Sequence, residues 1–542
     1  MWPLTGLEIV NVCACSCADP GLAEVQIAGV KADGTPPEPD ELFVALREPS
    51  YDFDGHGWVL PYLRAGAGLA LVAADWPLLP TLPLALRRRC IVVLDSLRAF
   101  RRLAAWLRRQ FSFQVIAVGG SNGKTTTKDM IAALLSGPGF RVTKTPGNLN
   151  GYTGIPLTLA QRAYCRAAPP HALVVEVGID SPLAMADHAA MLAPEVVLLA
   201  ALGPEHLAGL GSWEAAVAEE LLLLEATAST RRVFQARDAK VRERLVTARP
   251  GDVIVCDEDQ VAEAVRAALG RACGGDCEQR REFQARQEIA ELSRRGVSLL
   301  TFRVACPAPL ASEVELSYYP ATAQSAEPSW RGCLNVPMAG RHNADNVSAA
   351  FASALAVGRS PDELVRGWSS FEPPAMRYQA TALPDDGILI DDTYNASPAS
   401  MAAAFALLGS PAFRSRRKVL ILGDMLDLGG SSEVWHRALC EPLRGLENAH
   451  VFLFGEAMRG VHRVLAAMTS SVHFLPADAD PCSFLTHPYA ATAGAVVLVK
   501  GSRGMRLDRV VDEILRRAWA PAAAGQRASA PIGSGMLGAA VS

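Results

Sequence analysis

The sequence lacks the features that would favour a nucleic acid or a membrane as a partner. Its 542 residues carry 52 Lys and Arg against 56 Asp and Glu, a formal net charge of −4, so no excess of positive charge attracts a polyanion. It contains no apolar run of about 18 residues, and its N-terminus lacks a basic segment followed by a long apolar one. We therefore expect a cytoplasmic, monomeric protein without nucleic-acid binding or membrane insertion.

The cysteines do not have the spacing of a metal site. Twelve of them are scattered over the whole chain, which in a large cytoplasmic protein indicates reduced thiols. Two clusters could bind a metal, Cys13-Ala-Cys15-Ser-Cys17 and the pair Cys273 and Cys277. Each lacks the further His or Cys residues that complete a four-ligand zinc site, so we interpret them as ordinary small residues.

The length predicts three domains, and the pattern of apolar segments predicts the α/β class. Residues 1–112 form a small α/β unit. Residues 113–371 alternate strands with helices, which is typical of a mostly parallel sheet. Within them, 240–335 is rich in turn formers and shows few clear strands. Residues 372–525 contain four further strands, as expected for a second doubly wound sheet, and the Ala-, Gly- and Ser-rich tail 526–542 is predicted to be disordered.

The strongest motif is a glycine-rich turn between a predicted strand and a predicted helix. The apolar run 115–118 enters the turn Gly120-Ser-Asn-Gly-Lys-Thr125, and helical spacing follows over 128–135. Glycines and a helix N-terminus favour a bound phosphate, Lys124 adds a positive charge, and Thr125 can offer its hydroxyl to a phosphate-bound Mg²⁺. Lys occurs at only seven positions, which adds weight to this one. The alternative, a turn with a solvated lysine, explains neither the strand nor the run of threonines.

Other candidate residues follow later strands. Glu176 ends a buried strand, which is the Mg²⁺-holding position of P-loop enzymes, although a surface acid is the alternative. His206 lies on a loop after the next strand, on the side where ligands of α/β sheets bind, although an isolated loop His is more often structural. Asn343 and Asn346 stand three apart at a helix start, where they could bind a base edge or cap the helix.

Taken together, these motifs resemble the Mur ligase family, over residues 25 to 520. The motifs that carry the resemblance are Gly120-Ser-Asn-Gly-Lys-Thr125, Thr145-Pro-Gly-Asn-Leu-Asn150, Glu176 before Gly178, Gly203-Pro-x-His206, Gly340-Arg-His-Asn-x-x-Asn346, Asp391-Asp-Thr-Tyr-Asn-Ala396, Leu422-Gly-Asp-Met-Leu-Asp-Leu-Gly429 with His436, and Leu498-Val-Lys-Gly-Ser-Arg-Gly-Met-Arg506. The last two resemble the branch that adds D-alanyl-D-alanine to UDP-N-acetylmuramoyl tripeptide.

The resemblance implies a fold and a reaction. Its three domains would be an N-terminal UDP-sugar domain, a central ATPase domain, and a C-terminal Rossmann-like domain that closes over the nucleotide. ATP would phosphorylate the terminal carboxylate of the UDP-muramoyl peptide, and the amine of D-alanyl-D-alanine would then attack the acyl phosphate in peptidoglycan precursor synthesis. Holding a carboxylate and a γ-phosphate in line requires positive charge, which Lys124 and two Mg²⁺ ions would supply.

The resemblance also implies roles for single residues. ATP would be bound by Gly120, Ser121, Asn122, Gly123, Lys124, Thr125, Thr126, Asn343, Asn346, Arg377 and Asp392, with the two Asn on adenine, Asp392 on the ribose and Arg377 on the phosphates. Thr125 and Glu176 would hold one Mg²⁺, and His206 and Glu220 the other. The catalytic residues would be Lys124, His206 and Glu220.

The chain departs from the family pattern at several positions. The Asp-Ser-Arg segment that contacts the uridine diphosphate is Asp33-Gly-Thr35 here, so an arginine is missing, and two family asparagines are Ala201 and Ser397. These departures concern the substrate more than ATP binding. Two alternatives therefore stay open: a diverged ligase that joins another carboxylate and amine, and a non-catalytic nucleotide-binding relative.

Glu220 stands where most of the family has a carbamylated lysine. The segment from His206 to Glu220 aligns with the family pattern without a gap, and no Lys lies between Lys144 and Lys240. A glutamate carries the same negative charge at its tip, and Mg²⁺ accepts carboxylates. We hypothesise that Glu220 replaces the carbamate; the alternative is a solvated helix acid beside Glu219.

Overall fold

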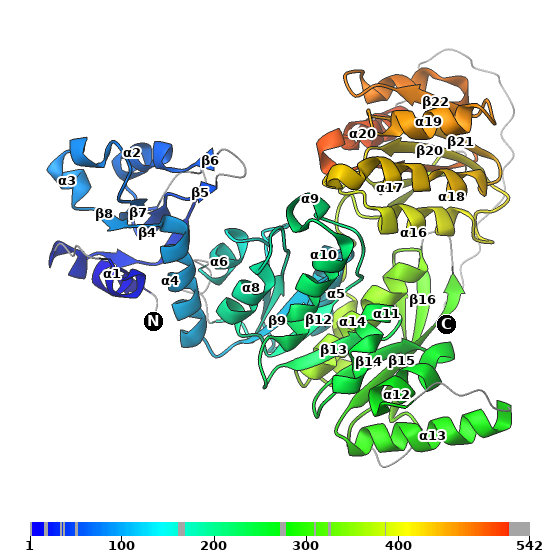
Figure 1. Cartoon of the computed structure of the whole chain (residues 1–542), viewed down its shortest axis with the longest axis horizontal. Helices are drawn as coiled ribbons and strands as arrows, with labels where there is room; N and C mark the ends of the chain where they lie inside the picture. The colour runs from blue at the N-terminus through cyan, green and yellow to red at the C-terminus, as the bar shows by residue number, and fades with distance from the viewer. Residues whose placement is uncertain are drawn as a thin grey trace, which may run out of the picture.

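The computed structural model describes residues 3–15, 20–32, 35, 38–48, 53–160, 169–271, 278–307, 311–322, 327–384 and 386–519. Figure 1 shows three α/β bodies, coloured blue, cyan to green, and yellow to red along the chain. Each is built on its own main sheet, and the predicted α/β class is confirmed. None of the helices in these ranges is long and apolar enough to cross a bilayer.

The N-terminal body is a four-stranded parallel sheet with helices against it. Its strands, in pairing order, are β3 (Gly29–Lys31), β4 (Glu41–Val44), β7 (Leu69–Ala73) and β8 (Cys90–Val93). Its helices are α1 (Gly6–Cys13), α2 (His56–Ala65), α3 (Leu84–Arg87) and α4 (Ser96–Gln110), and two short antiparallel pairs join β1 (Leu4–Thr5) to β2 (Gln26–Ile27) and β5 (Arg47–Glu48) to β6 (Phe53–Asp54). The thiols of Cys13 and Cys15 donate to backbone carbonyls, whereas Cys17, Cys273 and Cys277 lie outside the described residues.

Helix α4 connects the N-terminal body to the central one. Asp95 caps its N-terminus by accepting a hydrogen bond from the Arg98 amide at 2.9 Å. Near its C-terminus, Arg108 donates to the Leu192 carbonyl at 2.7 Å and pairs with Glu195 at 2.7 Å. Because Arg108 is buried, these contacts attach the helix firmly to the central body.

The central body is a nine-stranded sheet in which seven neighbouring strands are parallel and the last two are antiparallel. In pairing order they are β10 (Val142–Lys144), β11 (Ala172–Glu176), β9 (Gln114–Gly119), β12 (Val196–Leu199), β13 (Arg231–Gln235), β14 (Val253–Asp257), β15 (Ser298–Pro307), β16 (Ser312–Tyr319) and β17 (Trp330–Val336). The helices are α5 (Lys124–Leu135), α6 (Gly154–Leu159), α8 (Ala184–Leu192), α9 (Leu207–Leu210), α10 (Trp213–Leu221), α11 (Ala239–Glu243), α12 (Val261–Leu269), α13 (Glu278–Arg294), α14 (Arg341–Ala356) and α15 (Pro361–Trp368).

The prediction of few strands over 240–335 was wrong. This stretch contains the long helix α13, the strands β14, β15 and β16, and most of β17, which ends at Val336. Strands β16 and β17 were missed because they largely alternate buried residues with more exposed ones, so no continuous apolar run marks them. Strands β16 and β17 form an antiparallel edge beside the parallel strand β15.

The C-terminal body is a six-stranded sheet, parallel except for its first strand. In pairing order the strands are β18 (Gln379–Leu383), β19 (Gly387–Asp392), β23 (Ala495–Lys500), β20 (Arg417–Gly423), β21 (Ala449–Phe454) and β22 (Val472–Leu475). The helices are α16 (Pro398–Leu408), α17 (Ser432–Ala438), α18 (Cys440–Arg444), α19 (Met458–Ala466) and α20 (Asp508–Ala518). The four predicted strands are present, and β18 and β22 add to them.

The breaks between the three main sheets lie between β8 and β9 and between β17 and β18. We propose domain boundaries at 112/113 and 371/372 from these breaks, with α4 assigned to the first domain. The tail 526–542 lies outside the described residues.

Helices α14 and α15 pack on α5, the helix that follows the glycine-rich turn. The contact with α15 requires a glycine, because a Cβ added at Gly367 would lie 2.4 Å from the Leu134 carbonyl oxygen and 2.6 Å from that of Ser136. Both atoms belong to the backbone at the end of α5 and cannot rotate away. The position of α5 therefore depends on this close approach.

We predict that Gly367→Ala lowers the free energy of unfolding by about 1–3 kcal/mol, because an overpacked core forces the two helices apart. Urea titration measures the change. Gly460→Ala is the matched control: it lies inside α19, a Cβ there meets nothing within 4 Å, and it should leave stability unchanged or raise it slightly. Equal stability of the Gly367 variant and wild type would contradict the packing argument.

Candidate active site

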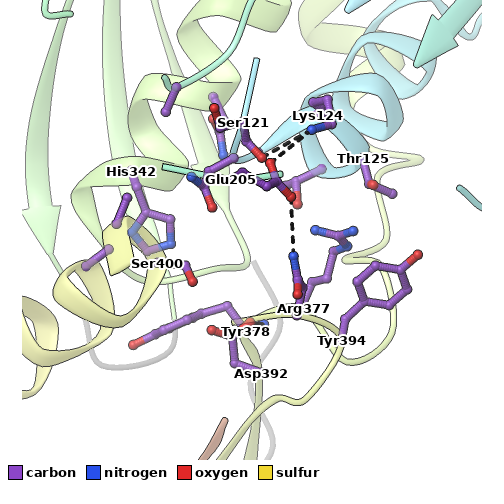
Figure 2. Close-up of a pocket in the computed structure, with 18 of the residues that line it drawn as sticks. Ser121, Lys124, Thr125, Glu205, His342, Arg377, Tyr378, Asp392, Tyr394 and Ser400 are labelled. Atoms are coloured by element: carbon purple, nitrogen blue, oxygen red, sulfur yellow. Dashed lines mark hydrogen bonds and ion pairs between the residues drawn. The ribbon is translucent and has the colours of Figure 1, made fainter. Parts of the chain in front are cut away.

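A cavity of about 460 Å³ lies between the central and C-terminal bodies. Figure 2 shows side chains from both bodies pointing into it, with Lys124, Thr125 and Glu205 on one side and Arg377, Tyr378, Asp392 and Tyr394 on the other. Its described lining comprises Ser121, Asn122, Gly123, Lys124, Thr125, Thr126, Asn148, Asn150, Glu176, Ala201, Glu205, His206, Met338, His342, Asn343, Asn346, Arg377, Tyr378, Asp392, Tyr394, Asn395, Ala399, Ser400, Ala403, Lys500 and Arg503.

The glycine-rich turn has a fixed shape. The amides of Ser121 and Asn122 donate to the Ala201 carbonyl at 2.8 and 3.0 Å, which ties the turn to the loop after β12. Gly123 has a φ of 84°, and a Cβ there would lie 2.7 Å from Asn346 Oδ1, so the position requires glycine. Helix α5 starts at the next residue, and the amides of a first helical turn have no intrahelical partner. They are therefore available to an anion in the cavity.

Lys124 is buried beside several carboxylates. Its Nζ donates to the Ser121 carbonyl at 3.2 Å and lies 3.3 Å from Glu205 Oε2. Burial alone would lower the pKa of Lys124, but the charges of Glu205, Glu220 and Glu176 raise it above its ordinary value. The ammonium therefore stays charged.

Thr125 and Glu176 fit a divalent cation. The hydroxyl of Thr125 is buried and has no hydrogen-bond partner among the described residues, and the same holds for Glu176 Oε2. Glu176 Oε1 accepts from Asn150 Nδ2 at 2.8 Å, while Lys128 Nζ lies 3.4 Å from Oε2, at ion-pair distance but without a hydrogen bond. Buried oxygens of these types, which accept no hydrogen bond from the described residues, suit Mg²⁺, which uses one or two carboxylates and takes further ligands from phosphates and water.

Glu220 packs against the turn rather than the cavity. It is 3% exposed, and its Oε2 accepts the Gly120 amide at 2.7 Å. Burial raises the pKa of Glu220 to about 7, although Lys124 and the Gly120 amide act in the opposite direction. Neither Glu220 nor Gly120 belongs to the described cavity lining. The Glu220 carboxylate supports the turn from its buried side.

Asn343, Asn346 and His342 form another wall of the cavity. Asn343 and Asn346 lie in the first turns of α14, and Asn343 Nδ2 donates to the Ala339 carbonyl at 2.8 Å, so part of its amide is used inside the fold. The His342 ring meets Tyr378 edge-on at 5.4 Å. Burial lowers the pKa of His342 to about 4, so this ring is neutral at pH 7 and offers an apolar face as well as ring nitrogens.

The C-terminal body contributes a carboxylate and a guanidinium. Asp392 Oδ2 accepts from the buried Lys500 at 2.6 Å, and Oδ1 accepts from the Tyr378 amide at 3.3 Å. The Arg377 guanidinium lies over the Tyr394 ring, 3.9 Å from its centre, which orients its charge at the cavity. The segment before β18 is strained, because Met376 and Tyr378 both have positive φ.

Two family models match the chain in the bodies that form this cavity. The Mur ligase middle domain matches residues 118–276, and the Mur ligase glutamate ligase domain matches residues 376–503, together more than half of the chain. The chain belongs to the Mur ligase family. It is therefore an ATP-dependent ligase that forms amide bonds.

Mur ligases of known activity match almost the whole chain. The UDP-N-acetylmuramoyl-tripeptide--D-alanyl-D-alanine ligase of Bacillus subtilis (strain 168) is 26% identical over 508 residues, which cover 92% of this chain and 95% of that one. The enzyme of the same name from Escherichia coli (strain K12) is 28% identical over 494 residues, with 90% and 94% covered. The resemblance inferred from the motifs is thus confirmed at the level of the family.

Solved Mur ligase structures share the fold. A crystal structure of MurF from Acinetobacter baumannii has a TM-score of 0.71 at 22% identity and covers 95% of this chain and 99% of its own. MurF ligase from Thermotoga maritima, solved in complex with ADP, has a TM-score of 0.67 at 21% identity, with 90% and 98% covered. The three-domain Mur ligase architecture of this chain is therefore confirmed.

Two departures from the Mur ligase pattern have a structural role here. Ser397 Oγ caps α16 by accepting the Ser400 amide, and it donates to Asn122 Oδ1 at 2.6 Å, so it joins the C-terminal body to the glycine-rich turn. Ala201 forms a short β-bridge with Asn122 through its backbone, which any residue could supply. The altered segment at Asp33 and Gly34 lies outside the described residues.

The cavity brings together most of the residues predicted for this Mur ligase. Residues 121–126, Glu176, His206, Asn343, Asn346, Arg377 and Asp392 all line it, and their roles in binding stay predictions. Sequence reasoning missed Glu205, His342, Tyr378, Asn395 and Lys500 as lining residues. All of these except Tyr378 lie within the motifs that carry the family resemblance. Their position beside the predicted site residues could therefore have identified them.

We predict that the stability of this Mur ligase falls as the pH rises, because of Glu220. Its folded pKa of about 7 exceeds the ordinary glutamate pKa of 4.5, so between these pH values the folded chain binds more protons than the unfolded chain. This contribution is fully present below about pH 4.5, is lost as the pH rises through about 7, and amounts to ~3 kcal/mol.

Glu220→Gln removes the titratable carboxyl group and keeps the size and shape of the side chain. Its free energy of unfolding relative to wild type should therefore increase between about pH 5 and pH 8, as denaturant titrations at each pH would measure. Glu214→Gln, at an exposed position of the same helix, is the control and should parallel wild type. A constant difference between Glu220→Gln and wild type would contradict the raised pKa.

Proposed function

We propose that this Mur ligase adds D-alanyl-D-alanine to UDP-N-acetylmuramoyl tripeptide in cytoplasmic peptidoglycan precursor synthesis, acting as a monomer. The observation that carries the proposal is the match to ligases of that name over 90% or more of both chains. The cavity supports it with groups suited to a nucleotide: a helix N-terminus, a buried lysine and two asparagines. The proposed substrates are those in the names of the relatives, and the proposed use of ATP is supported by the residues that line the cavity.

The nucleotide would lie across both bodies. The amides at the start of α5 and the Lys124 ammonium face the phosphates, and Arg377 approaches them from the C-terminal body. Asn343 and Asn346 face the base, and Asp392, held by Lys500, is placed for a ribose hydroxyl. Thr125 and Glu176 would hold Mg²⁺, which when bound offsets the negative charge of the phosphates.

The reaction places two anions close together. The terminal carboxylate of the tripeptide attacks the γ-phosphorus, the bond to ADP breaks, and an acyl phosphate forms. The amine of D-alanyl-D-alanine then attacks the acyl carbon, phosphate leaves with the bonding electrons, and the amine loses a proton. Lys124 stays charged in the cavity and lowers the repulsion between the two anions before the first step.

The roles of His206 and Glu220 in this scheme stay predictions. His206 lies at the rim of the cavity, at the start of α9, and its side chain is 36% exposed, so it is accessible to a second cation. Glu220 would reach such a cation only by leaving the Gly120 amide. Activity of Glu220→Gln with and without bicarbonate tests whether Glu220 replaces a carbamate; full activity without bicarbonate would show that its charge is not needed.

A second candidate function is ligation of a different carboxylate and amine by the same chemistry. The observation that favours it is the segment Asp33-Gly-Thr35, which offers no guanidinium to a uridine diphosphate. The deciding experiment measures phosphate release from ATP by purified protein, with UDP-N-acetylmuramoyl tripeptide and D-alanyl-D-alanine each present or omitted. Release that needs both supports the first proposal, and release that needs neither contradicts both.

We predict that Lys124→Ala lowers phosphate release by at least about a thousandfold, because it removes the buried ammonium beside the phosphates. The fold should persist with lower stability, since the lysine packs in no hydrophobic core but its loss leaves the neighbouring acids without the ammonium. Lys240→Ala, which removes an exposed ion pair with Glu243, is the control and should keep full activity. Unchanged activity of Lys124→Ala would remove Lys124 from the proposed mechanism.

A further inference from the structure

Glu205 places a carboxylate inside the phosphate end of the cavity. It lies on the loop between β12 and α9, its side chain is 14% exposed, and its Oε2 lies 3.3 Å from Lys124 Nζ. Figure 2 shows it directed at Lys124, with a second dashed line towards the side of the C-terminal body. The Lys124 ammonium, which we expect to bind a phosphate, is therefore already paired with the Glu205 carboxylate.

The other two acids near Lys124 are differently engaged. Glu176 is bound by Asn150 and pairs with Lys128, and Glu220 is buried against the Gly120 amide. Only Glu205, among these three, both lines the cavity and contacts Lys124 directly. A nucleotide phosphate that approaches Lys124 would therefore meet this carboxylate first.

The Glu205 carboxylate is held in place from three sides. Besides Lys124, its Oε1 accepts from Asn395 Nδ2 at 3.5 Å and lies 3.7 Å from His206 Nε2. The loop that carries it is hydrogen-bonded to the glycine-rich turn, through the Ala201 carbonyl and through the Gly203 amide, which donates to Ser121 Oγ at 3.0 Å. The carboxylate is thus restrained near Lys124 by both bodies.

Two anions on one ammonium repel each other unless a further cation separates them. Four cations belong to the described lining of the cavity. Lys500 is paired with Asp392, Arg503 with Asp508, and Lys124 with Glu205 itself, whereas Arg377 lies over Tyr394 and can approach the phosphates. The metal-free nucleotide therefore binds against the charge of Glu205 with the guanidinium of Arg377 to offset it, whereas its magnesium complex brings two further positive charges.

We propose that Glu205 makes the site selective for metal-complexed nucleotide over the free anion. This inference rests on the proposed function, because it requires the cavity to bind a nucleotide. Glu205 acts as a positioning residue: it holds Lys124 in the cavity and repels phosphates that arrive without a cation. Through its hydrogen bond from Asn395, Glu205 also links the central body to the C-terminal body.

The test is calorimetric titration of the full chain with ADP, in excess MgCl₂ and in EDTA. In wild type the Kd for ADP should be much higher in EDTA. Glu205→Gln keeps the size and the acceptor for Asn395 but removes the charge, so it should lower the Kd in EDTA at least about tenfold, which corresponds to about 1.4 kcal/mol, and change the Kd in MgCl₂ much less. Glu214→Gln, an exposed acid with the same charge change, should behave as wild type.

The possible results separate failure of the inference about Glu205 from failure of the proposed function. An unchanged Kd in EDTA for a Glu205→Gln protein that unfolds at the wild-type temperature would overturn the inference alone. A Kd that rises only in MgCl₂ would also overturn it, because it would make Glu205 a ligand of the cation. A wild-type protein that binds no ADP in either buffer would overturn the proposed function together with the inference.

Discussion

The structure of the candidate site depends on one buried ammonium among carboxylates. Lys124 is removed from water, which alone would favour its neutral form, and the charges of Glu205, Glu220 and Glu176 restore the charged form. Each of these acids is in turn held by another element: Glu205 by Asn395, Glu220 by the Gly120 amide, Glu176 by Asn150. Removing the lysine would leave uncompensated acids in a confined space.

Contacts between the central and C-terminal bodies converge on the same turn. Ser397 bonds to Asn122, and Asn395 bonds to Glu205, so both reach the phosphate end of the cavity. The C-terminal body also supplies Arg377 and Asp392 to the lining. The two bodies therefore form the cavity together. Their relative position determines the shape of the cavity and which charged side chains line it.

The parts of the site that could be predicted from the sequence are those encoded locally. The turn around Lys124 and the acid that ends β11 are short motifs attached to strands, so their spacing alone predicts where they lie. Asn122 and Ser397 are 275 residues apart, and Glu205 and Asn395 are 190 apart, so these contacts arise from the packing of bodies and leave no trace in local spacing. The role of Glu220 as a cation ligand stays a prediction from the alignment, which gives no sign of the hydrogen bond that its carboxylate accepts from the Gly120 amide.

The most direct test of a shared site is hydrogen exchange with and without magnesium and ADP. If the nucleotide binds across both bodies, amides in 120–127, in 341–346 and in 376–396 should all exchange more slowly in the complex. Protection of 120–127 alone, with 376–396 unchanged, would show that the C-terminal body does not take part in binding. That result would contradict the two-body site on which this account of the protein rests.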